Sequence, residues 1–588
     1  MGARYNIAPM RGWSDLAERV RATTRTSEKT ALLADYLRQL PADELRPAAV
    51  FLSGRPFAAA DQRVLGLGWA AIQTVVESLA GVPAGALGQA YDRSSDLGTA
   101  VAEVLASRAR QSDPSHSPRI ADVARAFDTI EAAPGPAARA AVLSALLERC
   151  DPLTAGYVVK VMTGELRIGL RDGLLEAAVA RAFDRPAEDV QWAGMLTGDP
   201  GETAVLAKEN RLGEARLRLF RPIKFMLASP AENASEIVSR LGPVVWVEDK
   251  YDGIRAQLHR CGAEARLYSR DLNDIGEQFP EIVEAARGLA WDGILDGEIV
   301  AYADGHVLPF LTLQARLGRK DPTPEVRAQV PVIYVAFDML AAGPRSEGPG
   351  SDGPRSDVEP LLRIPLSERR ARLEAVGLPL IAGGGSFALS HLMTADSAEA
   401  LDRLFEEARA RRNEGLMVKD PDSGYSPGRR GLGWLKMKRA LATIDCAVVG
   451  VELGHGKRHG VLSDYTFAVR DESTGKLVTI GKAYTGLTDA EIAEMTRWFE
   501  AHTVRQMGRF RVVEPEVVIE VAFDVIQRSS RHQSGFSLRF PRIARLRPDK
   551  STADIDTLTT VARLYRDLQA GAEHLVTAQA RKRDRQTS

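Results

Sequence analysis

The sequence predicts a multidomain protein with an all-α N-terminal domain, an α+β central domain and a C-terminal β-barrel domain. Its 588 residues are too many for one hydrophobic core, because a domain typically holds roughly 150 residues. From about residue 13 to residue 189, alanine, leucine, arginine and glutamate recur with helical periodicity. From about residue 442 to residue 548, apolar residues alternate over strand lengths between glycine-rich turns, which favours a small barrel.

The composition excludes several classes of protein. Apolar residues make up 45% and charged residues 26% of the chain, which is ordinary for globular proteins. The formal charge of −1 argues against a uniformly basic nucleic-acid binder but permits local basic faces. Three distant cysteines form neither a disulfide framework nor a metal site, so a reducing compartment fits best. No run of about 18 apolar residues occurs, and we expect a cytoplasmic protein without a membrane role.

Within the helical region, residues 164–173 combine three glycines with Arg167 and Arg171, directly before a helix expected at 174–182. Glycines let backbone amides approach phosphates, and arginines neutralise phosphate charge. One interpretation is a loop that grips a nucleic-acid backbone. The other is an ordinary turn between helices with solvated arginines, and these residues alone favour neither.

The most informative stretch begins at Lys250, which follows an apolar run at 244–247 that predicts a buried strand. The pair Asp252-Gly253 reads as a turn, and Arg255 comes next. A free lysine amine has a pKa of about 10.4, so a nucleophilic Lys250 needs burial and neighbouring cations such as Arg255 to lower it. The stretch indicates covalent nucleotidyl transfer. Taken alone, it also fits a solvated lysine beside a surface turn.

Residue types that bind phosphate, metal and bases recur downstream at the ends of expected strands. Arg270 follows a strand-like run and suits a phosphate or the end of a nucleic-acid strand. Asp296 and Glu298 lie in an apolar strand, which is costly unless they are paired, hydrogen-bonded or metal-bound. Phe337 offers a ring for stacking a base, and Glu414 repeats the carboxylate pattern.

Lys436 and Lys438 lie on one face of another expected strand. Each of these residues alone has a structural alternative: Phe337 in a core, Glu298 or Glu414 in a buried ion pair, the lysines on a solvated face. Their joint occurrence in this order within one segment outweighs those alternatives.

Two segments carry no predicted catalytic role. Residues 343–359 contain a Gly-Pro-Arg-Ser near-repeat that cannot bury a core, and we expect a flexible, disordered surface insertion. A last helix is expected at 557–577, followed by a solvated, frayed basic tail at 581–583.

This order of residues resembles the covalent nucleotidyltransferase superfamily of ATP-dependent DNA ligases and mRNA-capping enzymes, which share six collinear motifs. The resemblance covers nearly the whole chain and implies an ATP-grasp-like adenylation domain followed by an OB-fold barrel. It implies that Lys250 becomes the lysyl-nucleotide and that Glu248 contacts adenine through its backbone. Glu298 matches the carboxylate that contacts the ribose, and Phe337 matches the aromatic residue that stacks on the base.

The resemblance also assigns roles to charged residues. Arg255 and Arg270 match arginines that contact phosphate or the nick, and Arg430 occupies another nucleotide-contacting position. Glu298 and Glu414 match carboxylates used for the metal ion.

Lys436 and Lys438 match lysines that contact the α-phosphate. Residues 538–542 resemble the last motif, which the family carries on its OB-fold and in which Arg539 and Arg542 help to orient the leaving pyrophosphate.

Within the superfamily, two features resemble the three-domain DNA ligases. Residues 222–228 resemble the lead-in to their adenylation domain, although Phe225 stands where a proline is common. The helical region resembles their DNA-binding domain, which implies DNA contacts by Arg167, Arg171 and Arg270. The expected domains are 1–205 (helical, DNA-binding), 206–440 (adenylation, with the insertion at 343–359), 441–555 (OB-fold) and 556–588 (C-terminal helix and basic tail).

The resemblance implies a DNA ligase that uses ATP as substrate and Mg²⁺ to seal nicks in duplex DNA during replication, repair or recombination. It implies a monomer that encircles DNA. The alanine- and arginine-rich composition indicates a GC-rich, bacterial source, hence a place at the nucleoid. An enzyme of the same superfamily acting on RNA ends, such as an RNA ligase or a GTP-using capping enzyme, remains an alternative, as does a noncatalytic scaffold built on the same fold.

Overall fold

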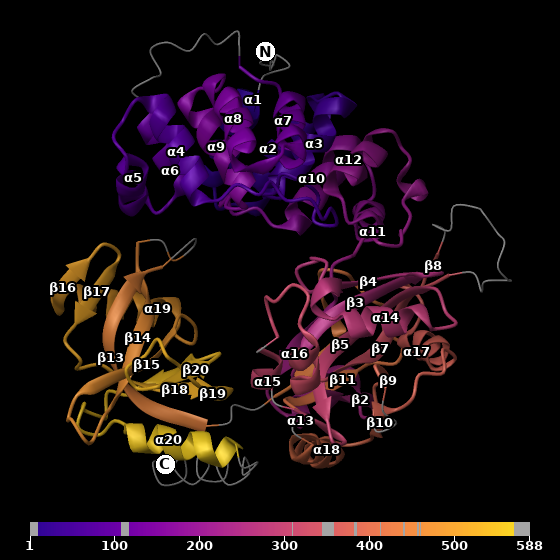
Figure 1. The fold of residues 1–588 in the computed structure, drawn as a ribbon, viewed down its shortest axis with the longest axis vertical. Helices are drawn as coiled ribbons and strands as arrows, with labels where there is room; N and C mark the ends of the chain where they lie inside the picture. Colours follow the sequence, from indigo (N-terminus) through magenta and orange to yellow (C-terminus); the bar gives the residue numbers. More distant parts are fainter. Residues whose placement is uncertain are drawn as a thin grey trace.

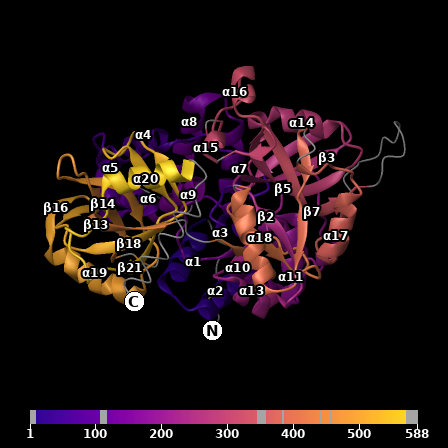
Figure 2. The ribbon, with the colours of Figure 1, turned by 90° about the horizontal axis from the view of Figure 1, so that it is seen from below.

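The computed structural model describes residues 10–106, 117–308, 310–314, 316–343, 358–381, 385–411, 413–438, 442–454, 458 and 460–569. The chain forms an all-α part, then an α+β part, then a part rich in β-strands, and this confirms the predicted fold classes in their predicted order. The helical part lies across the top of Figure 1, with the barrel and the central part side by side below it. Seen from below in Figure 2, the barrel and the central part flank the helices behind them.

The N-terminal part is all-α. Its elements are α1 (Met10–Ala22), α2 (Thr26–Gln39), α3 (Ala42–Leu52), α4 (Trp69–Ala80), α5 (Ala86–Ser94), α6 (Leu97–Leu105), α7 (Ile120–Ala132), α8 (Gly135–Glu148), α9 (Pro152–Thr163), α10 (Asp172–Phe183), α11 (Ala187–Thr197), α12 (Pro200–Lys208) and the short 3-10 helix η3 (Leu212–Glu214). Trp13 is fully buried and packs edge-on against Phe51 and Tyr157, with ring centroids 6.4 and 6.0 Å apart. Because α12 continues through residue 205, the helical part extends beyond the boundary expected there.

The glycine-rich segment forms the turn between α9 and α10. Gly169 has a φ of +65° and Arg167 a φ of +50°, so the turn passes through the left-handed region. Lys29 is buried beneath it, and its Nζ donates hydrogen bonds to the carbonyl oxygens of Ile168 and Gly169 at 2.6 and 3.2 Å. The buried Lys29 side chain therefore holds the backbone of this turn in its conformation.

The central part contains two sheets. The first has the strand order β1-β12-β11-β2-β10, and the second has the path β4-β3-β5-β7-β8, with β6 on β5 and β9 on β7. The strands are β1 (Leu227–Ala231), β2 (Val245–Lys250), β3 (Ile254–Cys261), β4 (Glu264–Ser269), β5 (Gly293–Ala303), β6 (His306–Val307), β7 (Val332–Ala342), β8 (Glu359–Pro360), β9 (Phe387–Leu389), β10 (Leu392–Ala395), β11 (Gly415–Lys419) and β12 (Arg430–Met437).

Helices cover these sheets. They are α13 (Ala234–Leu241), η4 (Gly276–Gln278), α14 (Pro280–Arg287), α15 (Phe310–Gln314), α16 (Pro324–Gln329), α17 (Leu366–Glu374) and α18 (Ala398–Ala410). β1 and β12 pair in parallel, so the first and the last strand of the central part lie side by side. Of the insertion expected at 343–359, residues 344–357 lie outside the described residues, and its disorder stays a prediction.

The C-terminal part is built on a barrel-like sheet. Its strands are β13 (Ala442–Leu453), β14 (Leu462–Arg470), β15 (Leu477–Ala483), β16 (Thr503–Met507), β17 (Phe510–Val513), β18 (Val518–Phe523), β19 (Val525–Arg528), β20 (Phe536–Arg539) and β21 (Arg542–Leu546), with the helix α19 (Asp489–Ala501). The central strand β13 pairs with β14, β17 and β18, and the apolar faces of these strands enclose one core.

The last described helix, α20 (Leu558–Gln569), belongs to the barrel part rather than to a separate C-terminal unit. Val561 and Leu564 are buried in the same apolar cluster as the barrel strands. The helix after residue 555 therefore packs on the barrel, and the domain division expected there stays a prediction. Residues 570–588, with the basic tail at 581–583, lie outside the described residues.

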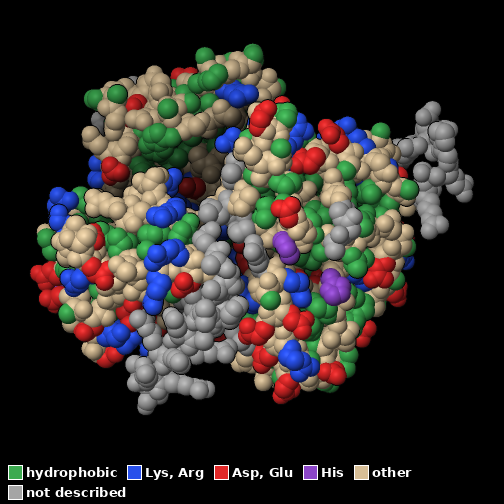
Figure 3. Space-filling view, turned by 60° about the horizontal axis from the view of Figure 1, so that its bottom comes forward, with side chains coloured by type: hydrophobic (Ala, Val, Ile, Leu, Met, Phe, Trp, Pro, Cys, Tyr) green, Lys and Arg blue, Asp and Glu red, His purple; other side chains and the backbone are tan. Residues whose placement is uncertain are grey.

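The helical and central parts touch through ion pairs such as that of Asp172 with Lys224 and through apolar packing of α11, and Lys438 of the central part pairs with Asp524 of the barrel. Basic and acidic side chains are interspersed over the face in Figure 3, and the surface is hollowed between the lobes. Of the helices that the structure describes, none is long and apolar enough to cross a membrane.

Candidate active site

Lys250 is the last residue of β2, the strand predicted by the apolar run before it. Its backbone pairs with Gly415 of β11, and the Glu414 amide donates a hydrogen bond to the Lys250 carbonyl at 2.8 Å. The Lys250 Nζ forms an ion pair with the Glu414 carboxylate, and 21% of the lysine side chain is exposed. A Cβ at Gly253 would lie 2.3 Å from the Ile299 carbonyl oxygen, which explains the glycine in the turn after Lys250.

Lys250 lines a cavity of about 210 Å³. Its walls come from both sheets of the central part, because β1, β2, β11 and β12 contribute on one side and β3, β5 and β7 on the other. The predicted site residues among its lining are Glu248, Lys250, Arg255, Arg270, Glu298, Phe337, Arg430 and Lys436. The predicted convergence of the nucleotide-binding residues therefore exists in the structure, while the role of each residue stays a prediction.

Aromatic rings form one part of the cavity wall. Phe337 and Trp434 meet edge to face with centroids 6.3 Å apart. The Lys419 Nζ lies 4.8 Å from the Phe337 ring and 4.4 Å from the Trp434 ring. It also pairs with the buried Glu248 carboxylate at 2.5 Å, so the Glu248 side chain is occupied and only its backbone is left for the predicted adenine contact.

Arg270, Arg430 and Lys436 supply positive charge to the same cavity. None of them forms an ion pair with a residue that the structure describes. Burial lowers the pKa of Lys436, and the positive charges of Lys250 and Lys438 lower it further. Three cations without carboxylate partners make this wall suitable for a polyphosphate.

Carboxylates surround the Lys250 amine. Burial raises the pKa of Asp252 to about 7, and the adjacent Glu414, which shares a hydrogen bond with it, adds to this effect. Burial also opposes ionisation of Glu414, but the attraction of Lys250 outweighs burial and lowers its pKa. Burial raises the pKa of Glu298 to about 8 despite the attraction of Lys250. Without a ligand, Glu414 is therefore the ionised partner of Lys250 while Glu298 tends to hold a proton; a bound cation would favour ionisation of Glu298, and carboxylate oxygens suit Mg²⁺.

Arg255 differs from its predicted role as a cation that activates Lys250. Its Nε and one terminal nitrogen donate to the Asp296 carboxylate at 3.1 and 2.7 Å, and the other terminal nitrogen donates to the Met226 carbonyl at 2.7 Å. Asp296 is fully buried and also accepts a hydrogen bond from the Tyr425 hydroxyl at 2.7 Å. The charge of Arg255 is thus balanced, and Lys436 is a better candidate for the neighbouring cation.

Of the two arginines predicted on the barrel, only one lies near Lys250. Lys438, just after β12, forms an ion pair with Asp524 of the barrel. The Arg539 guanidinium lies 4.0 Å from the Phe310 ring of the central part, and its charge acts on Asp252. Arg542 is exposed and does not line the cavity. The barrel is therefore docked with one of its two predicted arginines near Lys250.

The two arginines of the predicted DNA-binding turn, Arg167 and Arg171, differ in their contacts. The Arg167 guanidinium donates to the Ser95 carbonyl at 2.9 Å and pairs with Glu165 at 2.8 Å. Arg171 is exposed and has no ion pair within the described part of the chain. Arg167 thus supports the interpretation of an interhelical turn, and Arg171 stays available for a phosphate.

Three family models match the chain along its length. They describe the DNA ligase N terminus at residues 9–180, the ATP dependent DNA ligase domain at residues 225–438 and the ATP dependent DNA ligase C terminal region at residues 458–550. A probable DNA ligase of Koribacter versatilis is 44% identical over 93% of this chain and 95% of its own length. This chain belongs to the ATP-dependent DNA ligases. It is therefore an enzyme that ligates DNA, as the order of its motifs predicts.

Further relatives agree with this membership. A DNA ligase 1 of Korarchaeum cryptofilum is 35% identical to this ligase over 94% of the chain and 97% of its own length. A probable DNA ligase of Opitutus terrae is 44% identical over 93% of the chain, and the chain spans 61% of that relative's length. The solved structure named Pmar-Lig_PreS3 has a TM-score of 0.57 at 16% identity, covers 91% of this chain and 99% of its own, and shares the fold.

Sequence reasoning missed several residues that line the ligase cavity, among them Lys419 and Trp434. Trp434 lies two residues before Lys436 on β12, so the two side chains face the same side of the strand. That spacing could have predicted that Trp434 lines the same cavity as Lys436. Lys419 had none, because its partner Glu248 is 171 residues away in the chain.

Proposed function

We propose that this chain seals nicks in duplex DNA through a lysyl-AMP intermediate formed on Lys250. One observation carries the proposal: Lys250 shares its cavity with the rings of Phe337 and Trp434 and with cations that form no ion pair with any residue the structure describes. A purine base needs a stacking surface, and a triphosphate needs positive charge without competing carboxylates. ATP satisfies both parts of this cavity.

In the first transfer, the Lys250 Nζ attacks the α-phosphorus of ATP, a nitrogen–phosphorus bond forms and the bond to pyrophosphate breaks. The amine must first lose a proton, and Glu414 is its ion-pair partner. Glu414 shares a hydrogen bond with Asp252, whose pKa of about 7 allows it to hold a proton at neutral pH. The proton thus passes from Lys250 through Glu414 to Asp252, while Arg430 and Lys436 hold the phosphates.

The carboxylates of Glu298 and Glu414 fit Mg²⁺, because both offer oxygen donors and a cation beside Glu298 would favour its ionised form, which burial disfavours. A bound Mg²⁺ supplies positive charge to the phosphates of the substrate.

The second and third transfers use DNA. An oxygen of the 5′-phosphate at a nick attacks the phosphorus of AMP, and Lys250 leaves with its electron pair. The adjacent 3′-hydroxyl then attacks the 5′-phosphate, AMP leaves and the strand is continuous. Alignment of the two strand ends supplies most of the acceleration in these steps.

The barrel takes part mainly in the first transfer. With Arg539 acting on Asp252 and Lys438 paired with Asp524, the barrel is docked beside Lys250, which the 5′-phosphate of the nick must reach in the second transfer. It therefore reorients between steps, and this ion pair breaks. The ligase acts as a monomer that encircles nicked duplex DNA, largely through backbone contacts such as Arg171, and serves replication, repair or recombination at a bacterial nucleoid in the cytoplasm.

The test is a denaturing gel of a nicked duplex whose upstream strand carries a 5′ label, incubated with Mg²⁺ and either ATP or GTP. Joining with ATP alone is expected, and Lys250→Ala should join nothing. A matched nicked duplex with an RNA upstream strand separates DNA from RNA ends. Absence of a joined DNA product with either nucleotide would refute the proposed function.

A further inference from the structure

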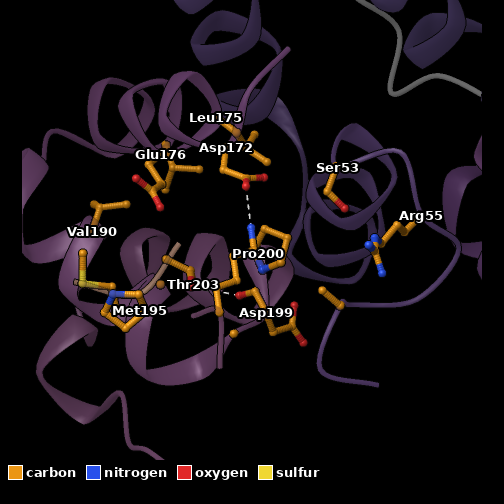
Figure 4. A pocket seen from close by; sticks show the side chains of 16 residues that line it. Ser53, Arg55, Asp172, Leu175, Glu176, Val190, Met195, Asp199, Pro200 and Thr203 are labelled. Atoms are coloured by element: carbon orange, nitrogen blue, oxygen red, sulfur yellow. Dashed lines mark hydrogen bonds and ion pairs between the residues drawn. The ribbon is translucent and has the colours of Figure 1, made fainter. Parts of the chain in front are cut away.

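The helix α10 of the helical part makes two ion pairs with the central part. Asp172 pairs with Lys224 at 2.5 Å, and Glu176 pairs with Arg429 at 2.5 Å. The two carboxylates are four residues apart, so they lie on one face of the helix. Figure 4 shows both of them at the rim of one cavity, with the contact of Asp172 marked.

The two basic partners belong to segments that also line the nucleotide cavity. Lys224 lies three residues before Leu227, and Arg429 is next to Arg430; Leu227 and Arg430 both line the cavity around Lys250. The two segments are joined to each other, because the Leu227 amide donates to the Arg429 carbonyl at 2.8 Å and Leu227 pairs with Arg430 in the sheet. A displacement of either segment therefore moves both a cavity wall and the attachment of α10.

A third contact joins the helical part to the loop after Arg270. The Gln62 Nε2 donates to the Leu272 carbonyl at 2.7 Å, and its Oε1 accepts from the Asp274 amide at 2.8 Å. Leu272 has a φ of +66°, in the left-handed region that a leucine rarely adopts. Gln62 thus holds an unusual loop conformation two residues after another residue of the nucleotide cavity.

The interface around α10 is open rather than packed. A cavity of about 350 Å³ lies there, lined by Asp172 and Glu176 (Figure 4). Lys224 lines it as well. Apolar packing occurs beside it instead, where Ala193 and Leu196 of α11 share a cluster with the central part. The helical part therefore contacts the central part through apolar packing at α11 and through ion pairs beside the cavity at α10.

We propose that Asp172, Glu176 and Gln62 are positioning residues that couple nucleotide occupancy to DNA binding by the helical part. The inference rests on the proposed function. AMP on Lys250 draws Arg270 and Arg430 toward its phosphate, and their neighbours pass the displacement to α10, which begins directly after the exposed Arg171. By reciprocity, DNA on the helical part favours AMP in the cavity.

The experiment compares the lysyl-AMP form with the AMP-free form, each with EDTA to prevent turnover. The probe is an intact, unnicked duplex, so that no 5′-phosphate touches the AMP directly. The lysyl-AMP form should bind at least about fivefold more tightly, and the variant Asp172→Asn, Glu176→Gln, Gln62→Leu should bring the two Kd values within about twofold. Equal Kd values for the two wild-type forms, or an undiminished ratio in the variant, would overturn the proposal.

Two controls separate coupling from damage to the fold. Asp35→Asn removes a carboxylate of the helical part that pairs with Arg38 at 3.1 Å within the same part, and it should keep the wild-type ratio. Asp172→Lys alone should reduce the ratio, and its combination with Lys224→Asp should restore it; no recovery would refute the role of this pair. Failure of the wild type to form lysyl-AMP, measured before DNA is added, would refute the proposed function instead.

Discussion

Replacing Glu298 with glutamine should stabilise the ligand-free protein increasingly as the pH rises. Burial of the Glu298 carboxyl raises its pKa to about 8, with the negative charges of Glu414 and Asp296 adding to the effect of burial. In the unfolded chain the same group has a pKa of 4.5. The folded protein without nucleotide and metal therefore resists ionisation of a residue that the proposed reaction needs charged.

The size of the effect follows from the two pKa values. Below pH 4.5 the carboxyl is protonated in both states, and Glu298 costs nothing. Between pH 4.5 and pH 8 the unfolded state loses the proton first, so the free energy of unfolding falls as the pH rises. At about 1.4 kcal/mol for each pKa unit, the full cost above pH 8 reaches about 5 kcal/mol as an upper bound. Glu298→Gln removes this cost because an amide does not ionise.

The assay is urea unfolding in EDTA at pH 5, 6.5 and 8, followed by tryptophan fluorescence of the central part. The stability advantage of Glu298→Gln should grow steadily from pH 5 to pH 8. Glu359→Gln is the matched control, because that carboxylate is 60% exposed and pairs with Arg372 at 2.8 Å in the same part. An advantage that stays constant with pH would refute the reasoning. The same substitution should abolish lysyl-AMP formation, so stability and activity would change in opposite directions.

Three further predictions concern the lysine, the barrel and DNA. Lys250→Ala should form no lysyl-AMP yet still seal a nick that already carries a 5′-AMP; labelling by ATP would contradict this. Asp524→Asn removes the partner of Lys438 and should slow lysyl-AMP formation about three- to tenfold, as expected for losing about 1 kcal/mol of a partly exposed ion pair. It should leave sealing of the pre-adenylated nick unchanged, and equal slowing of both reactions would contradict it. Arg171→Gln should lower the slope of log affinity for nicked DNA against log salt by about 0.9, while Arg181→Gln at the other end of α10 should not.

The sequence predicts the contents of the site well because each motif is local. Lys250, Glu298 and Phe337 occur in short strings at strands whose apolar pattern is clear, and the fold brings those strands to one cavity. The type of each side chain, such as an amine, a carboxylate or an aromatic ring, already indicates the chemistry that it can provide. Their convergence could therefore be inferred from order alone, without knowledge of any distance.

The partners of these residues could not be predicted, because pairing depends on distant parts of the chain. Asp296 and Glu298 look alike in an apolar strand, yet the first balances Arg255 and the second faces the cavity. Successive side chains alternate across a strand only in an ideal ladder, and the register of β5 with β7 shifts between Asp296 and Gly297. Gly297 permits such a shift, because a glycine inside a strand often marks a bulge, but the sequence does not say which of the two carboxylates then faces the cavity.

The packing of the last helix also depends on distant parts of the chain. The expected division at residue 555 followed a change from strand to helix, but α20 buries its apolar face against the barrel. A change of secondary structure marks a domain boundary only when the new element has its own core. A single helix of this length does not.

The parallel pairing of β1 with β12 has an evolutionary consequence. The strand by which the chain enters the adenylation domain lies at the edge of the sheet beside the strand by which it leaves, with entry and exit at opposite ends of this parallel pair. The matched ATP dependent DNA ligase domain, residues 225–438, begins and ends close to these two strands. Such a module can acquire or lose a neighbour at either end while its own strands keep their order, so genes can recombine around it without disturbing the catalytic cavity.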